Sequence, residues 1–194
     1  MDEKKALTYA ITRAIAYTEN GGKPDIKNPK AGKTGETKSI FQFEPETWKE
    51  DAKKILGDEN APITPDNETK VVTEKVSHWI DKGYNAKQIA SMWNAGESEP
   101  DAYTGKFSTG KSSKGINTKY GVGYDVPGYA EKVANYAKQF YTQDLSKQIA
   151  PTPQMQPTQV SQSTPQTTQP STQSQQSTGN NIPGLINKLA GING

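Results

Sequence analysis

Apolar residues recur three and four positions apart in five segments of the chain, the spacing of one face of an α-helix. The first helix is expected to end at Gly21 and Gly22, because glycine readily takes the left-handed conformation that closes a helix. Its apolar face consists of Leu7, Ala10, Ile11, Ala14 and Ile15. A polar loop over residues 23–38 follows. No long alternating strand pattern occurs, so the sequence predicts a mostly α-helical domain over residues 1–148.

The starts of the later helices are marked by proline or asparagine. Pro45, Pro65 and Pro127 fit a first helical position, where a missing N–H costs nothing, and Asn85 fits an N-cap. The predicted inward faces are Trp48, Ala52, Ile55 and Leu56; Val72, Val76, Trp79 and Ile80; Ala86, Ile89, Ala90 and Trp93; and Tyr129, Val133, Tyr136, Ala137, Phe140 and Tyr141. Residues 96–126 are rich in glycine and predict a long loop with room for a small hairpin.

The C-terminal part of the chain has a different composition. After Lys147 the sequence contains only one more Lys, Arg, Asp or Glu residue, Lys188. Residues 149–181 are mostly Gln, Thr, Ser and Pro and predict a disordered linker, because they have little to bury. Apolar residues return in 182–194, which we interpret as a short docking peptide that folds on a partner protein.

Composition and charge exclude several classes of protein. The net charge of +2 gives no strong attraction to nucleic acid, and a chain without cysteine has neither disulfides nor thiol-bound metal. No segment is apolar enough for a membrane span, and the first 19 residues show no recognisable signal peptide. His78 is the only histidine; we expect a structural role for it, and neither a metal site nor a cofactor.

The stretch GKFSTGKS, Gly105–Ser112, has the spacing of a phosphate-binding loop. Such a loop needs a buried strand before it and a helix that begins inside it, because the helix N-terminus faces the phosphates. The flanking residues ESEPDAYT and SKGINTKYGVG fit neither element. We therefore expect no nucleotide site here, and interpret the stretch as a basic flap beside a groove.

Glu19 is a candidate general acid. It is expected at the C-terminal end of the first helix, where the helix dipole disfavours a negative charge. The nearby apolar Ala16 and aromatic Tyr17 also disfavour a charge. Both effects raise the pKa of a carboxyl group. A raised pKa is what a general acid for glycosidic cleavage requires.

Four short blocks in order resemble the soluble lytic transglycosylases and related lysozyme-like peptidoglycan-cleaving domains, over roughly residues 5–142. They are AYTENGG (16–22), GETKSIFQFEPETW (35–48), SMWNAG (91–96) and GYAEKV (128–133). That family has a catalytic Glu at a helix end, a Gly-Leu-Met-Gln-x-x-Pro-x-Thr block, a Tyr-Asn-Ala-Gly block and a late helical Tyr. The matching positions are Glu19; Ser39, Ile40, Phe41, Gln42, Pro45 and Thr47; Trp93, Asn94, Ala95 and Gly96; and Tyr129. Ser39 replaces the usual Gly, Trp93 the usual Tyr, and Asn20 the Ser that usually follows the catalytic Glu.

The resemblance implies a lysozyme-like fold and cleavage of peptidoglycan glycan strands between N-acetylmuramic acid and N-acetylglucosamine. Glu19 would protonate the glycosidic oxygen and then act as base on the muramyl 6-hydroxyl, which closes a 1,6-anhydro ring. The implied substrate-binding residues are Ser39, Phe41, Gln42, Trp93, Asn94, Tyr129 and Glu36. Among these, Phe41 and Trp93 would offer apolar faces to pyranose rings, although core packing explains Trp93 equally well.

Two alternatives stay open. A hydrolytic muramidase needs a second carboxylate to hold or activate water, and Glu36 and Asp25 are the candidates. A non-catalytic virion structural protein would only bind glycan. A tethered peptide at 182–194 and the lack of an export signal favour a phage virion or a machine of the bacterial envelope as the setting, with a protein of that assembly as partner.

Overall fold

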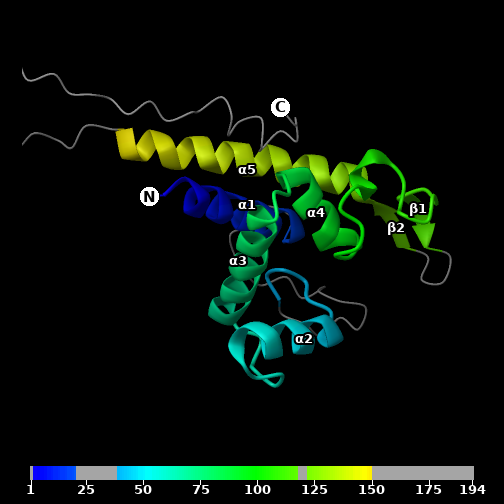
Figure 1. The fold of residues 1–194 in the computed structure, drawn as a ribbon, viewed down its shortest axis with the longest axis horizontal. Helices are drawn as coiled ribbons and strands as arrows, with labels where there is room; N and C mark the ends of the chain where they lie inside the picture. The colour runs from blue at the N-terminus through cyan, green and yellow to red at the C-terminus, as the bar shows by residue number, and fades with distance from the viewer. Residues whose placement is uncertain (1, 21–38, 118–121, 150–194) are drawn as a thin grey trace, which may run out of the picture.

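The structure, a computed structural model, describes residues 2–20, 39–117 and 122–149 (Figure 1). The linker after residue 149 and the peptide 182–194 lie outside the described residues. So do two of the candidate carboxylates, Asp25 and Glu36.

The described residues form five α-helices, one short 3-10 helix and one hairpin. In chain order they are α1 (Glu3–Glu19), α2 (Pro45–Leu56), α3 (Pro65–Asp81), α4 (Ala86–Ala95), η1 (Ala102–Thr104), β1 (Lys114–Asn117), β2 (Val122–Asp125) and α5 (Val126–Ile149). The prediction of a mostly α-helical domain is therefore confirmed, and the hairpin lies within the predicted loop.

The helix ends follow the local chemistry of the chain. Pro45 and Pro65 occupy first-turn positions of α2 and α3. Asn85 and Gln88 form a reciprocal capping box at the start of α4, in which each side chain binds the other residue's backbone N–H. α1 ends earlier than the glycines predicted: Asn20 closes it by donating its backbone N–H to Ala16.

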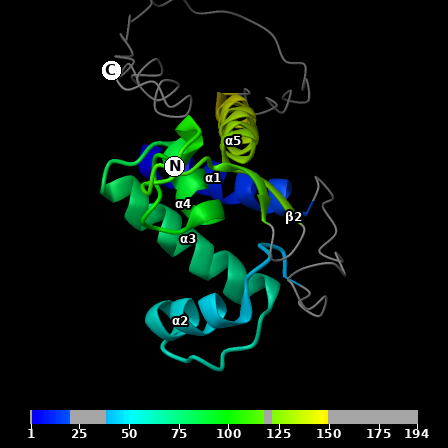
Figure 2. The ribbon, with the colours of Figure 1, turned by 90° about the vertical axis from the view of Figure 1, so that its right-hand side faces the viewer.

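α1 is the central helix of the domain (Figure 1). It packs along α5 on one side and against α3 on the other, while α4 also packs on α5. Figure 2 shows α3 running away from this group to meet α2 at the far end of the domain. The C-terminal end of α1 thereby comes close to residues from three other parts of the chain.

The loop that contains GKFSTGKS is closed by its own backbone. The N–H of Phe107 donates to Lys111 at 2.8 Å, and the N–H of Gly110 donates to Phe107 at 2.8 Å. The carboxylate of Glu99 accepts both the N–H and the hydroxyl of Ser108, each at 2.6 Å. The stretch lies between η1 and β1, where a phosphate-binding loop would lie between a buried strand and a helix.

Candidate active site

Glu19 is the last residue of α1, and three side chains from distant parts of the chain converge on it. The indole Nε1–H of Trp93, on α4, donates to Glu19 Oε1 at 3.1 Å. The hydroxyl of Tyr129, on α5, donates to the same oxygen at 2.6 Å. The amide of Gln42 donates to the main-chain carbonyl of Glu19. The carboxyl group and the helix end that carries it are therefore both held in place.

The environment of Glu19 raises the pKa of its carboxyl group above the ordinary value, mainly because burial penalises the charged form. The hydrogen bonds from Tyr129 and then Trp93 act in the opposite direction and lower the pKa, but burial outweighs them. Burial raises the pKa of Tyr129 well above its usual range, and the nearby Glu19 carboxylate raises it further, because both disfavour a phenolate. Tyr129 therefore acts here as a hydrogen-bond donor.

The two donors leave the oxygens of Glu19 unequal. Both reach Oε1, and within the described part of the chain Oε2 accepts from no donor. A proton on Oε2 is consistent with this arrangement, because Oε1 then serves as the carbonyl-like acceptor for both neighbours. The site can thus hold a protonated carboxylic acid without losing either hydrogen bond.

Two cavities meet at Glu19. One, of about 540 Å³, lies towards α2 and α3. The other, of about 470 Å³, lies towards β2 and α5. Glu19, Gln42 and Asn94 line both of them. The candidate acid therefore lies between two hollows on the surface, in reach of a molecule that occupies either one.

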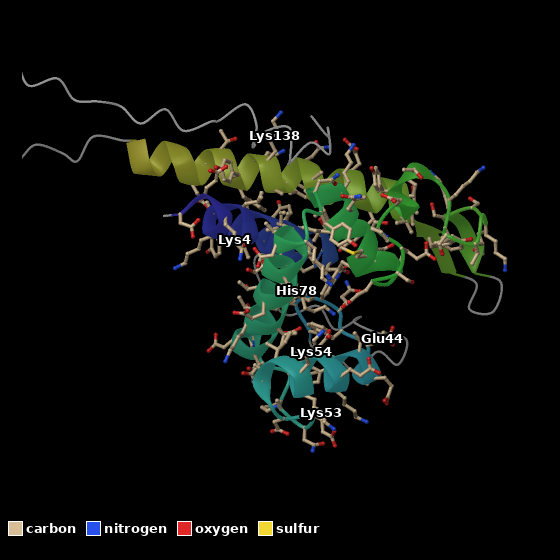
Figure 3. The ribbon with its side chains drawn as sticks, in the orientation of Figure 1. Lys4, Glu44, Lys53, Lys54, His78 and Lys138 are labelled. Carbon is tan, nitrogen blue, oxygen red and sulfur yellow. The ribbon has the colours of Figure 1, made fainter. Side chains whose placement is uncertain are left out.

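The larger cavity has charged walls. Lys75 on α3 forms ion pairs with Asp51 at 2.7 Å and with Glu97 at 3.1 Å. The ammonium also lies 5.4 Å from the ring centre of Trp79 and 6.0 Å from that of Trp93. Glu44, labelled at the start of α2 in Figure 3, lines the same cavity. These groups offer hydrogen-bond donors and acceptors to a polar ligand.

The sequence-predicted residues divide into those at the cleft and those behind it. Glu19, Gln42 and Trp93 line the larger cavity, and Tyr129 lines the smaller one. Phe41 also borders the larger cavity but is only 2% exposed, and it packs edge-on against Trp93 with ring centres 6.1 Å apart. It supports Trp93 and has no free face for a sugar ring.

Ser39 is likewise buried, which corrects its expected role as a substrate-binding residue. It is 2% exposed, and its hydroxyl donates to Glu68 and accepts the N–H of Phe43 at 3.0 Å. Its hydrogen-bonding capacity is used inside the domain, so its role is to hold the turn. Glu36 lies outside the described residues.

Besides the acidic groups around Lys75, three further charged residues were not predicted from the sequence. Lys75 and Asp125 line the cavities, and Glu68 is buried behind the turn 39–43. For Glu68 a signal existed: it lies four residues before Val72, on the apolar face of α3. Lys75 and Asp125 had no comparable signal, because isolated charges on loops and helices are usually solvated.

The described residues contain no group of three His, Asp or Glu side chains arranged to hold a metal ion. His78 is exposed on α3 (Figure 3). None of the described helices is both long enough and apolar enough to cross a membrane.

Comparison with known proteins finds no similar protein or family. No family model matches the chain, and neither the curated proteins nor the solved structures contain a match.

The raised pKa of Glu19 predicts a pH-dependent cost to stability. The folded state binds this proton more tightly than the unfolded chain, so the stability that the neutral form contributes is complete below about pH 4.5 and is lost as pH rises through the folded pKa. We expect Glu19→Gln to be more stable than the wild type at neutral pH, with the difference shrinking towards pH 4. Urea unfolding of both proteins across this range measures it. A constant difference would contradict the prediction.

Proposed function

We propose that this protein is a peptidoglycan lytic transglycosylase with Glu19 as its general acid and base. One observation supports this most: a carboxyl group with a raised pKa lies between two cavities and receives hydrogen bonds from Tyr129 and Trp93. The family resemblance of the blocks around these residues supplies the substrate class. The lysozyme-like fold is part of this proposal.

In the proposed reaction one carboxyl group acts twice. Glu19 gives its proton to the oxygen that links N-acetylmuramic acid to N-acetylglucosamine, and the bond from muramyl C1 to that oxygen breaks. The resulting carboxylate then takes the proton of the muramyl 6-hydroxyl as its oxygen bonds to C1. The proton count is restored, no water is consumed, and the products are a new 4-hydroxyl end and a 1,6-anhydro end.

The surroundings of Glu19 suit both halves of this cycle. Burial favours the protonated acid before cleavage. After proton transfer, the hydrogen bonds from Tyr129 and Trp93 stabilise the carboxylate, since bonds to a charged acceptor are stronger than bonds to a neutral one. The two cavities offer room for sugars on each side of the scissile bond, with Asn94 bordering both.

A hydrolytic muramidase is the second candidate, and Asp125 is the observation that favours it. This carboxylate lines the same cavity as Glu19 and Tyr129. Its pKa is lowered by hydrogen bonds from Lys114, at 2.9 Å, and from the backbone of Gly128, at 3.0 Å. It therefore stays ionised at neutral pH, as a group that holds water or stabilises a developing positive charge must.

The setting of the reaction is also a proposal. A phage virion or an envelope-spanning machine fits a wall-cleaving domain with a C-terminal peptide at 182–194 that binds a partner protein. A glycan-binding structural protein without activity is the outcome if Glu19 is not catalytic.

Glu19→Gln tests the catalytic assignment. We expect clearing of purified cell walls to fall by at least about 10²–10⁴-fold, the usual contribution of general acid–base catalysis, while pull-down of the protein with walls persists. Glu74→Gln is the matched control, because Glu74 is exposed on α3 and lines neither cavity at Glu19. Undiminished clearing by Glu19→Gln would eliminate the enzymatic proposal in both of its forms.

The masses of the released fragments separate the two reactions. A lytic transglycosylase leaves ends that weigh one water less than the reducing ends left by a muramidase. We expect anhydro ends from the wild type. If the wild type instead leaves reducing ends and Asp125→Asn does not, the protein is a hydrolase.

Tyr129→Phe tests the electrostatics of the acid. Removing the hydroxyl takes away the largest influence that lowers the pKa of Glu19, so the pKa rises further. The acid then stays protonated to higher pH, so the alkaline limb of the pH–rate profile should shift to higher pH. Loss of a hydrogen bond to a charged group, worth about 1.5–3 kcal/mol, should also slow clearing by roughly ten- to a hundredfold. An unmoved alkaline limb would show that Glu19 does not set it.

A further inference from the structure

Glu68 is a carboxyl group with no exposed surface, on a helix that does not itself carry the candidate acid. Burial raises its pKa, and the hydrogen bonds that it accepts act in the opposite direction. Three donors from the turn 39–43 converge on it. The hydroxyl of Ser39 donates to Oε1, the N–H of Ile40 donates to Oε2 at 3.2 Å, and the N–H of Phe41 donates to Oε1 at 3.4 Å. Burial of an ionisable group is costly unless it is well hydrogen-bonded, so this arrangement calls for an explanation.

The turn that Glu68 holds contains the one non-glycine residue with positive φ among the described residues. Gln42 has φ of 53°, in the left-handed region that side chains other than glycine seldom adopt. The hydrogen bonds to Glu68 fix the two residues before it, and the bond from Phe43 N–H to Ser39 fixes the residue after it. The surrounding bonds thus offset the local strain, as such conformations require.

Two routes lead from this turn to Glu19. In the first, the strained conformation directs the Gln42 amide to the main-chain carbonyl of Glu19. In the second, Phe41 packs against Trp93, whose indole donates to the Glu19 carboxylate. Glu68 therefore anchors the supports of both the backbone and the side chain of the candidate acid, without touching either.

We infer that Glu68 is a positioning residue for the site: through the turn 39–43 it fixes Gln42 and Trp93 against Glu19. The inference rests on the proposed function for its catalytic consequence. It also accounts for Ser39, which stands where the enzymes that the sequence resembles have Gly. Ser39 and Glu68 form one hydrogen-bonded unit, and the serine hydroxyl is needed because the carboxylate is there.

Glutamine at position 68 would have nearly the same volume but cannot replace the carboxylate. Its amide nitrogen would take one of the two oxygen positions, and both oxygens accept backbone N–H groups. A donor would then face a donor, at a buried place where an unmet hydrogen bond is costly. We expect Glu68→Gln to loosen the turn and admit water to Glu19.

The indole N–H signals provide a test that does not depend on activity. The chain has three tryptophans, so ¹⁵N NMR resolves three such signals, and Trp93→Phe assigns one of them. In the wild type the Trp93 signal should titrate with Glu19. In Glu68→Gln its midpoint should move down towards the ordinary range of a glutamate, because Glu19 is better hydrated. The Trp48 indole, bonded to the carbonyl of Ala61 at 2.8 Å, is the internal control.

Kinetics test the catalytic consequence. We expect Glu68→Gln to lower kcat for wall cleavage on the order of ten- to a hundredfold, with little change in wall binding. In the Gln42→Ala background the further loss of kcat should be smaller than in the wild type, because one of the two routes to Glu19 is already cut. Glu74→Gln, the same substitution on an exposed position of the same helix, should change neither kcat nor the titration.

The outcomes are distinct. A folded Glu68→Gln with an unchanged Trp93 midpoint and unchanged kcat overturns the inference and makes Glu68 a purely structural residue. If Glu68→Gln does not fold, Ser39→Ala is the second variant, because it removes the hydroxyl that joins Glu68 to Phe43 in the same turn; it must lower the midpoint. If the wild type cleaves no wall, the proposed function fails, and the NMR titration alone decides whether Glu68 positions Glu19.

Discussion

The balance of forces on the Glu19 carboxyl group is the constraint on which the rest of the site depends. Burial at the end of α1 favours the neutral acid, whereas Tyr129 and Trp93 favour the anion. In the proposed reaction, a group that donates a proton and then takes one back needs both influences at once. Neither alone would serve: without burial the acid would be ionised before use, and without the two donors its anion would be left without compensation.

The fold supplies these influences from separate helices. α1 carries the acid, α4 and α5 carry its two donors, and α3 holds the turn that presents Gln42. Because α3 and α5 pack on α1 and α4 packs on α5, a displacement of any of these three helices alters the environment of the carboxyl group. The site is therefore a property of the packed domain and cannot be attributed to one segment.

Much of the helical framework was predictable, because residues at the helix ends themselves determine where the helices begin. Pro45, Pro65 and Asn85 mark helix starts by the geometry of a first turn, and the structure places the starts there. The meeting of Gln42, Trp93 and Tyr129 at Glu19 followed only from a resemblance, since no local rule says which helix ends come together.

The features that could not be predicted from the sequence depend on which side chains are buried by distant parts of the chain. The sequence predicts that Ser39 and Phe41 bind substrate, but both side chains are buried. In the sequence, a serine or a phenylalanine in a turn looks the same whether it faces solvent or a neighbouring helix. Glu68 shows the converse, because a charge among apolar residues looks like an interruption of the pattern until its three donors are seen.

If Glu19 has the proposed role, its position between two hollows has a consequence for how a glycan polymer would be cut. A saccharide chain that lies across the acid needs no free terminus to engage it. Cuts would then fall at interior linkages, so that the network loses mechanical continuity after few events and long before small fragments accumulate. Such a mode of attack suits the opening of a local gap in a wall better than the recycling of its components.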